Sequence, residues 1–262
     1  MPKILVGIFL TFVYSTAVFA QSWEFGGRLG GAGYLGDLNT NNPVKVSGLS
    51  AGAFVKYNFN PYVSARLGYT YGHITAADSV SSNAQFRERN LSFSTNLNEL
   101  SLTGELNFLD YVPSISKNVF TPFIFGGAAL VNYNPVAVYQ GTSYQLRTLR
   151  TEGQGDAYAS TTWAIPYGVG FKYNFSGRLN LMADIGYRYV HSDYLDDVSG
   201  NYASKAQFTD NVARAFSDRS GENNNIYIGS EGTQRGDQRP HDTYFFIGLS
   251  ISYTFITQKC YY

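Results

Sequence analysis

The sequence predicts an all-β fold, namely a transmembrane antiparallel up-and-down β-barrel of about eight strands with long extracellular loops and short periplasmic turns. Two observations lead to this fold class. Apolar residues alternate with glycine, serine and charged residues over repeated stretches of the chain. Tyrosine (22) and phenylalanine (19) are abundant while charged residues are only 15% of the 262 residues, as expected for strands with aromatic residues at two membrane interfaces.

The alternation is clearest in residues 164–190, which read as two strands joined by a tight turn at 174–179. Side chains of a strand alternate between its two faces. One face is apolar and comprises Ile165, Tyr167, Val169, Phe171, Tyr173, Leu181, Ala183, Ile185, Tyr187 and Tyr189. The other holds glycine and charged residues, which is too polar for the core of a soluble protein. The segment therefore indicates a barrel with an apolar outside and a polar inside.

The same pattern predicts six further strands, at 23–35, 49–59, 63–72, 99–108, 123–133 and 245–255. The strand at 123–133 is apolar on both faces, so its orientation stays open. In the last strand, Phe245 and every second residue after it are expected to face outward. Pro122 and Pro166 are awkward in a closed sheet, and we expect each near the start of its strand, where a missing N–H is tolerated.

The connections alternate in length. Polar segments at 37–46, 75–95, 134–162 and 191–242 follow the first, third, fifth and seventh strands, and shorter turns follow the others. Outer-membrane barrels place their short turns in the periplasm and their long loops outside. We therefore expect a protein of the outer membrane of a Gram-negative bacterium, with both termini periplasmic and with outer-membrane lipids and lipopolysaccharide as its surroundings.

The N-terminus resembles a secretory signal peptide. Lys3 is followed by an apolar run, and Val18-Phe19-Ala20 supplies small residues at the positions that signal peptidase reads. We predict a signal peptide at 1–20 and one barrel domain at 21–262. After residue 20, no apolar run approaches the ~20 residues of a transmembrane helix. The only cysteine is Cys260, so a disulfide within the chain is excluded.

Nine charged residues fall on strand faces that we assign to the inside of the barrel. They are Glu24, Arg28, Lys56, Arg66, Glu99, Glu105, Lys172, Asp184 and Arg188. The interior of an eight-stranded barrel is just wide enough for side chains to fill it, and unpaired buried charges are very costly. We therefore expect a paired charge network in the lumen and a plugged barrel without sizeable conductance.

No motif supports catalysis or a cofactor. Residues 31–36 match the dinucleotide-binding pattern G-x-G-x-x-G, but a loop rather than a helix is expected to follow them. The histidines His73, His191 and His241 fall in loops or at strand ends. Asp193, Asp196 and Asp197 lie near His191 without the ligand spacing of a calcium loop, so we interpret them as solvated loop acids. We expect a non-enzyme with no cofactor and no metal, and the zero net charge gives no sign of nucleic-acid binding.

Several motifs resemble the PorG-like family of small outer-membrane barrels, formerly described as a domain of unknown function and found in bacteria with type IX secretion. They are GAGYLGDL at 31–38, TEGQG at 151–155, AIPYGVGFKY at 164–173, GYRYVHSDYLDDVSGNY at 186–202 and Arg235-Gly236. The resemblance implies an assembly component associated with a periplasmic ring of PorK- and PorN-like proteins. It implies no role for any single residue.

Three functions compete at this level. The first is a non-catalytic barrel that anchors or organises a periplasmic type IX secretion assembly through its turns at 58–62, 109–119 and 174–179 and its tail at 257–262. The second is a surface-recognition or adhesion barrel that binds a ligand through loops 134–162 and 191–242. The third, a small-solute channel, is disfavoured by the charges inside the barrel.

Overall fold

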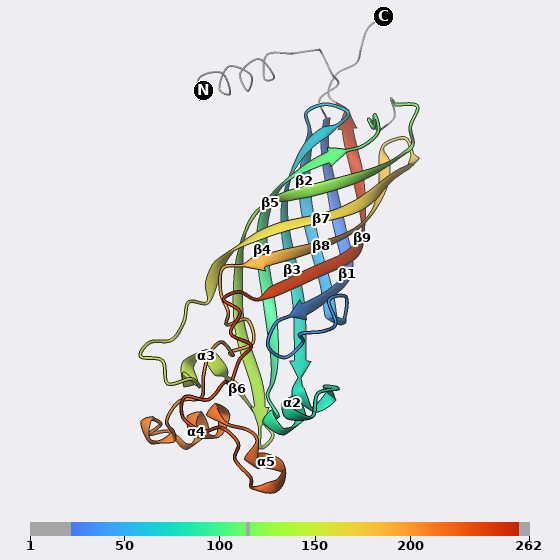
Figure 1. Ribbon diagram of the computed structural model, residues 1–262. Coiled ribbons are helices and arrows are strands. Elements are labelled where there is room, and N and C mark those ends of the chain that lie inside the picture. The colour runs from blue at the N-terminus through green and yellow to red at the C-terminus, as the bar shows by residue number, and fades with distance from the viewer. Residues whose placement is uncertain (1–21, 114–115, 257–262) are drawn as a thin grey trace, which may run out of the picture.

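The computed structural model describes residues 22–113 and 116–256 and contains a closed antiparallel β-barrel (Figure 1). The signal peptide predicted at 1–20, the tail at 257–262 and Cys260 lie outside the described residues. The wall consists of β1 (Ser22–Leu35), β2 (Val46–Asn58), β3 (Val63–Ala77), β4 (Ser92–Asn107), β5 (Phe120–Tyr139), β7 (Thr161–Ser176), β8 (Leu179–Val190) and β9 (Thr243–Ile256). Neighbours along the chain pair in order, β1 pairs with β9 and β4 pairs with β5, which closes the ring. The predicted eight-stranded barrel is confirmed.

Several strands extend further than the alternation predicts. β3 runs to Ala77 and β4 begins at Ser92, so the ends of the predicted polar segment 75–95 are strand. β5 continues to Tyr139 and pairs beyond the ring with β6 (Thr142–Gln145). These extensions carry polar side chains on their outer face, such as His73 opposite Asn96, whereas Ile74 and Phe93 on the inner face are buried. The hydrophobic pattern ends where the apolar wall ends, whereas backbone pairing continues past it.

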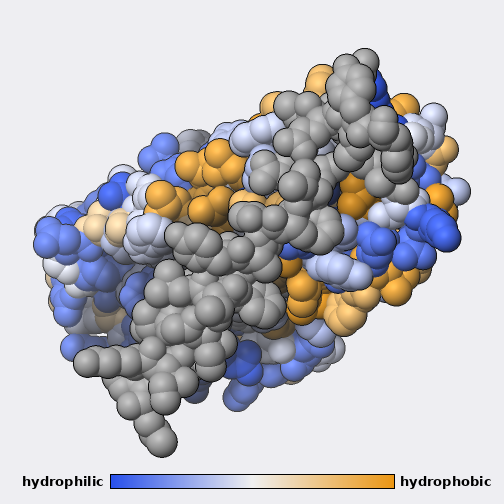
Figure 2. Space-filling model, turned by 90° about the horizontal axis from the view of Figure 1, so that it is seen from above, coloured by the Kyte–Doolittle hydropathy of each residue, from blue (hydrophilic) through white to orange (hydrophobic). Residues whose placement is uncertain are grey.

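Many large apolar side chains are exposed on the outside of the wall, and some of these apolar patches are visible in Figure 2. In the hairpin of β7 and β8, the predicted apolar face is the exposed one, with Val169 at 53% exposure. The orientation of β5 is settled by burial: Ile124 and Leu130 are exposed, and Phe125 and Val131 face the interior. The barrel therefore has an apolar exterior and a polar interior, as predicted.

Phe245 is an exception to the exposed outer face, because only 1% of its surface is exposed. Its ring lies over Gly33, where a Cβ atom would clash with it. The ring of Tyr187 lies 5.5 Å away, and the Tyr187 hydroxyl donates a hydrogen bond to the Pro43 carbonyl at 3.0 Å. The loop after β1 therefore folds back over this part of the wall, which the strand pattern alone does not reveal.

The placement expected for Pro166 near the start of its strand is wrong. Pro166 is the sixth residue of β7, which begins at Thr161. Pairing of β5 with β7 stops at Gly126 opposite Tyr167 and resumes at Ala129 opposite Ala164. The proline has no N–H to donate, and the ladder is interrupted where the donor is missing. Pro122 lies at the third position of β5, as expected.

The two ends of the barrel differ (Figure 1). One end carries the short turns 59–62, 108–119 and 177–178, together with the paired ends of β1 and β9 at Ser22 and Ile256. The other end carries four loops at 36–45, 78–91, 140–160 and 191–242, which we call the cap. The alternation of short and long connections is confirmed.

The cap contains short helical segments and closes one mouth of the barrel. They are η1 (Asp78–Val80), α2 (Ala84–Arg89), α3 (Leu146–Leu149), η2 (Lys205–Gln207), α4 (Asn211–Ser217) and α5 (Gly221–Asn224). Leu195 is fully buried in one apolar core with Phe93, Leu97 and Phe246 of the wall. The Thr95 hydroxyl donates to the Leu195 carbonyl at 2.8 Å, which fixes the start of loop 191–242 in the mouth. Among residues 22–113 and 116–256, no helix is long and apolar enough to cross a membrane.

Val169 and Val138 are matched sites for testing the membrane position of the wall. Both are exposed, at 53% and 57%, but Val169 lies in the middle of β7 and Val138 on the part of β5 beyond the ring. A charge at the bilayer midplane costs about 2–4 kcal/mol, falling to about 0–1 kcal/mol near the interfaces. We expect Val169→Lys to lower the free energy of unfolding in lipid vesicles by about 2–4 kcal/mol and Val138→Lys by less than about 1 kcal/mol. Equal effects of the two substitutions in urea titrations would contradict this placement.

Candidate functional site

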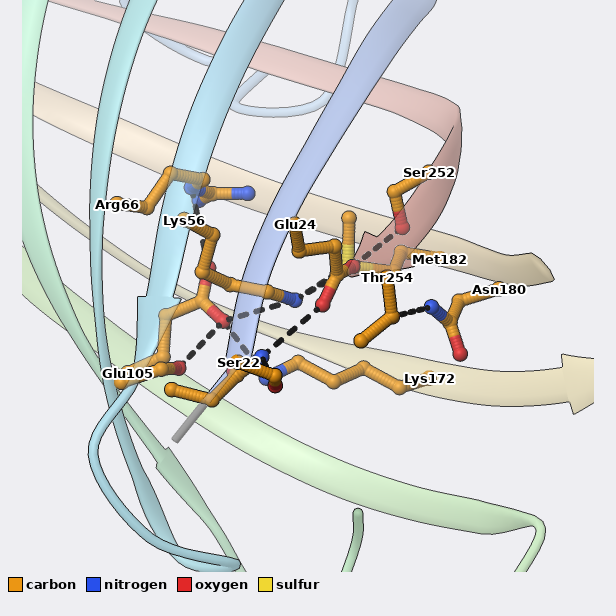
Figure 3. A network of polar contacts seen from close by, with 12 residues as sticks. Ser22, Glu24, Lys56, Arg66, Glu105, Lys172, Asn180, Met182, Ser252 and Thr254 are labelled. Atoms are coloured by element: carbon orange, nitrogen blue, oxygen red, sulfur yellow. Dashed lines mark hydrogen bonds and ion pairs between the residues drawn. The ribbon is translucent and has the colours of Figure 1, made fainter. Parts of the chain in front are cut away.

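The structure places all nine predicted lumen charges inside the barrel, where each takes part in an ion pair. Glu105 of β4 is the centre of the half nearer the short turns (Figure 3). Its carboxylate lies 2.6 Å from Lys172 Nζ, 3.1 Å from Arg66 Nε and 3.9 Å from Lys56 Nζ. Lys56 lies 2.9 Å from Glu24. Lys56 and Arg66 are directly opposite on paired strands, and Glu105 compensates the repulsion of these like charges.

A second group of ion pairs fills the half nearer the cap. Arg188 of β8 binds Glu99 of β4 through two N–H groups, at 2.8 and 3.2 Å. Such paired hydrogen bonds between guanidinium and carboxylate are among the strong ones in proteins. The Tyr244 hydroxyl donates to the same carboxylate at 2.7 Å, and Arg28 reaches Asp184 at 3.1 Å. The Tyr244–Glu99 contact joins strands on opposite sides of the barrel, because three strands separate β9 from β4 in either direction. Arg28 and Asp184 join β1 and β8, which only β9 separates.

Four phenylalanines share the lumen with these charges, and the sequence interpretation does not identify them. The guanidinium of Arg66 lies 5.6 Å from the ring centre of Phe54 and 5.2 Å from that of Phe125. Arg188 lies 4.6 Å from the ring of Phe246, and Lys172 Nζ lies 4.5 Å from the ring of Phe123. Their position in the strand could have identified them: Phe54 is two residues from Lys56 and therefore lies on the same strand face. An aromatic residue on a polar face is easily missed when aromatic residues are expected outside.

Little space remains between these side chains. A cavity of about 20 Å³ lies in the middle of the barrel among Arg28, Phe54, Arg66 and Arg188, which is room for about one water molecule. Among the residues that the structure describes, Arg28 Nε and Nη2 and Asp184 Oδ1 are buried without a hydrogen-bond partner. One ordered water is the expected partner for such groups. This part of the interior is therefore packed by the described side chains.

The cap is held by a second set of buried ion pairs, centred on Arg89 at the end of α2. Arg89 binds the Asp78 carboxylate through two N–H groups, at 2.7 and 2.8 Å. It also donates to the Arg235 carbonyl at 2.6 Å and to the Asp37 carbonyl at 3.0 Å. One side chain thereby connects three of the four cap loops.

Arg235 and Glu152 connect the remaining loop. Arg235 donates to Glu152 Oε1 at 2.9 Å and to the Asp197 carbonyl at 2.8 Å. The Glu152 carboxylate also accepts hydrogen bonds from the backbone N–H groups of Ser199 and Gly200. The motifs TEGQG and Arg235-Gly236 and the 186–202 segment, which carry the family resemblance, thus meet within the cap.

The loop acids that we expected to be solvated are buried. Asp193 is 9% exposed, Asp196 2% and Asp197 1%. Asp197 accepts hydrogen bonds from Thr151 at 2.6 Å and Tyr158 at 2.8 Å, and burial raises its pKa to about 6. The interpretation as solvated acids was wrong because loop 191–242 folds inward over the mouth instead of extending into water.

Two further acids, Asp37 and Asp242, lie beside Asp193 in the cap. Burial is the main cause that raises the pKa of both Asp37 and Asp193 to about 7, and it also raises the pKa of Asp242. Asp37 and Asp193 are each a further cause of the raised pKa of Asp242, since neighbouring carboxylates disfavour one another's charged form. The sequence interpretation considers Asp193 but not the two acids that it meets.

The other motifs take ordinary structural roles. Residues 31–35 of the G-x-G-x-x-G match lie in β1 and are followed by loop 36–45, so the helix that a dinucleotide site requires is missing at this position. His191 stacks on His241 at 5.3 Å, and His241 contacts Tyr189 at 4.7 Å. In the described part of the chain, the group of acids with metal-ligand proximity contains no histidine.

Comparison with known families and structures gives one family match. The model of the family described as Domain of unknown function (DUF6089) matches residues 2–210, which is more than half of the chain. No curated protein matches the chain.

Among solved structures, the chain is similar to Neisserial surface protein A (NspA), with 9% identity over 90% of this chain and 96% of that chain and a TM-score of 0.40. It is also similar to the N-terminal β-barrel domain of Pseudomonas aeruginosa OprF, with 12% identity over 90% and 98% of the chains and a TM-score of 0.38. A major outer membrane protein from Thermus thermophilus has 13% identity over 89% and 99%, with a TM-score of 0.40.

Glu105→Gln tests the lumen network, because three cations depend on this carboxylate. Breaking a buried ion pair by removing one partner costs about 3–5 kcal/mol. We expect Glu105→Gln to lower the free energy of unfolding by about that amount. Glu231→Gln, at an exposed loop position, is the control and should change it by less than about 0.5 kcal/mol. Equal stability of the two variants in denaturant titrations would show that the network is not required.

Proposed function

The chain belongs to the family described as Domain of unknown function (DUF6089), and from this membership and its closed interior we propose a non-catalytic outer-membrane barrel that anchors or organises a periplasmic type IX secretion assembly. The observation that carries the proposal is the packed lumen, with its paired charges and a cavity of only about 20 Å³. A barrel without a path for solutes acts through its surfaces. The resemblance to the PorG-like family supports the type IX assignment.

An outer-membrane location follows from the wall. Closed barrels satisfy every backbone hydrogen bond within the sheet, and an apolar exterior suits the hydrocarbon core of a bilayer. Short turns lie in the periplasm and long loops outside in this class of barrel. In this orientation the paired ends of β1 and β9 at Ser22 and Ile256 are periplasmic, and the cap faces the exterior next to lipopolysaccharide.

The partner surface is then the end with the short turns. Phe59, Phe108 and Phe175 are exposed there, at 47%, 60% and 50%. Exposed aromatic residues at this level serve both the lipid interface and protein contacts. The partners proposed from the resemblance are ring proteins of the PorK and PorN type. Residues 114–115 and the tail 257–262, also proposed for this surface, lie outside the described residues.

Surface recognition is the second candidate function. The observation in its favour is a cleft of about 450 Å³ in the cap, lined among others by Phe86, Arg89, Tyr202, Ile228 and Arg235. Its volume is within the range of small-molecule sites, about 300–1,000 Å³. In this function the cap binds a ligand, and the barrel only anchors the cap in the membrane.

A conductance measurement tests the closed interior. We expect purified protein in planar bilayers to give no conductance steps at the nanosiemens level, because ion pairs and phenylalanine rings fill the lumen. A second variant, in which a short glycine-serine linker replaces residues 204–231 of the cap, is measured in the same assay to test whether the lumen stays closed without this loop. Tyr202 and Thr233, each one residue outside the cut ends, are already joined by a backbone hydrogen bond of 2.8 Å. This variant should also remain closed, and nanosiemens steps from the intact chain would contradict the proposal.

Crosslinking and secretion test the proposed role directly. A photo-reactive amino acid in place of Lys117 or Arg178, both exposed at the short turns, should capture the secretion-ring proteins. The same amino acid in place of Asp156, exposed in the cap, is the control and should not capture them. A strain lacking the protein should lose secretion of type IX cargo, and normal secretion would reject the proposal. Normal secretion in the deletion strain, together with loss of surface ligand binding or adhesion in the 204–231 linker variant, would favour surface recognition.

A further inference from the structure

Three carboxylates from distant parts of the chain converge in the cap. Asp37 lies in the loop after β1, Asp193 is the third residue after β8, and Asp242 immediately precedes β9. One carboxylate oxygen from each lies within 4.8 Å of the others. Asp37 is 1% exposed, Asp193 9% and Asp242 0%. The three acids are therefore enclosed by protein at the root of the longest loop.

The described residues pair no arginine or lysine with these three carboxylates. The nearest guanidinium groups are used elsewhere, since Arg89 pairs with Asp78 and Arg235 pairs with Glu152. Arg89 reaches Asp37 only at its backbone carbonyl. Unpaired buried charges are strongly unfavourable, and native proteins pair them or bind metal ions to them. The barrel interior of this same chain follows that rule with ion pairs.

Asp37 also presents an unsatisfied oxygen. Its Oδ1 accepts a hydrogen bond from the Asp237 backbone N–H, whereas its Oδ2 is buried without a hydrogen-bond partner among the described residues. Asp242 differs, because its Oδ2 accepts from the Leu195 N–H at 2.9 Å and its Oδ1 lies 3.4 Å from the Tyr34 hydroxyl. A buried carboxylate oxygen with no donor, on an acid that lies beside two other carboxylates, requires a cation or a proton.

Two glycines allow the acids to come this close. A Cβ atom at Gly36 would clash with Asp242 Oδ1, and one at Gly236 would lie 2.8 Å from Asp37 Oδ1. A side chain at either position would displace a carboxylate of the cluster. The backbone is therefore arranged to bring the oxygens together rather than to separate their charges.

We propose that Asp37, Asp193 and Asp242 bind a calcium ion that fastens the loop after β1 to both ends of loop 191–242. Calcium takes oxygen ligands at ~2.3–2.6 Å, so two ligand oxygens on one ion lie at most ~5 Å apart, which the observed proximity satisfies. An all-carboxylate set without histidine or cysteine selects hard cations over zinc or copper. Calcium is favoured over magnesium because it accepts irregular geometry with fewer retained waters.

The ion has a structural consequence for the cap. Loop 191–242 leaves the wall at β8 and returns at β9, and Asp193 and Asp242 are at these two roots. Joining Asp193 and Asp242 to Asp37 holds Leu195 in the mouth of the barrel, because the Leu195 backbone N–H donates a hydrogen bond to the Asp242 carboxylate. Without the cation, repulsion among the acids loosens the same contacts. The site is independent of the proposed secretion role, and its test does not measure secretion.

Terbium luminescence and limited proteolysis test the site on the purified full barrel. Terbium replaces calcium at oxygen sites, and Tyr34, whose hydroxyl lies 3.4 Å from Asp242, is a sensitiser within range. We expect saturable terbium emission that calcium displaces, and calcium should slow protease cleavage of loop 191–242 at least tenfold relative to chelator. Asp37→Asn keeps the Oδ1 acceptor and removes the carboxylate charge, and it should weaken calcium binding at least tenfold, as should Asp193→Asn and Asp242→Asn.

Asp156→Asn, at an exposed position in the cap, is the matched control and should bind calcium as the parent does. Retained heat-dependent mobility of each variant in gel electrophoresis shows that the barrel is folded. In chelator, Asp37→Asn should resist protease at least as well as the parent, since a repulsive charge is gone. The proposal is overturned if the parent binds no calcium, if it binds magnesium in preference to calcium, or if the three variants bind calcium like the control.

Discussion

Charge burial inside an apolar wall is the constraint on which this structure depends. The barrel directs its apolar side chains outward, so its polar side chains occupy a narrow interior. The cavity among Arg28, Phe54 and Arg66 has room for about one water molecule. Each charge placed there needs a partner of opposite sign. Glu105 is the ion-pair partner of Lys172, Arg66 and Lys56 together. The network joins strands across the barrel and ties its opposite walls together.

The same constraint organises the cap, where it is met in two ways. Arg89 and Arg235 neutralise Asp78 and Glu152 and bring the four loops together. Asp37, Asp193 and Asp242 have no such partner in the described residues, and a bound cation or a proton neutralises such a group of carboxylates. A closed lumen below a closed cap directs the search for function to the surfaces of the two ends, and of these the resemblance favours the end with the short turns.

The strand faces could be predicted because alternation has a period of two and needs no knowledge of neighbours. The exposed face of β7 and the charges Lys172 and Asp184 inside were predicted on this basis. Phe54 and Phe125 were not placed inside, because Arg66 makes the lumen suitable for their rings only once the strands are curled together. Pro166 was misplaced because the strand start depends on pairing beyond the apolar belt.

Local periodicity was sufficient for the fold class, the alternation of connections and the choice of charged side chains that face the lumen, since none of these requires knowledge of distant residues. Which charges pair depends on the closed ring, because Glu99 and Arg188 are 89 positions apart and meet only across it. The burial of polar loop residues depends on tertiary structure as well. Asp193 and Asp196 look like solvated acids in sequence, and only the inward fold of loop 191–242 removes them from water. Local patterns report a residue's face, whereas long-range contacts determine its partners.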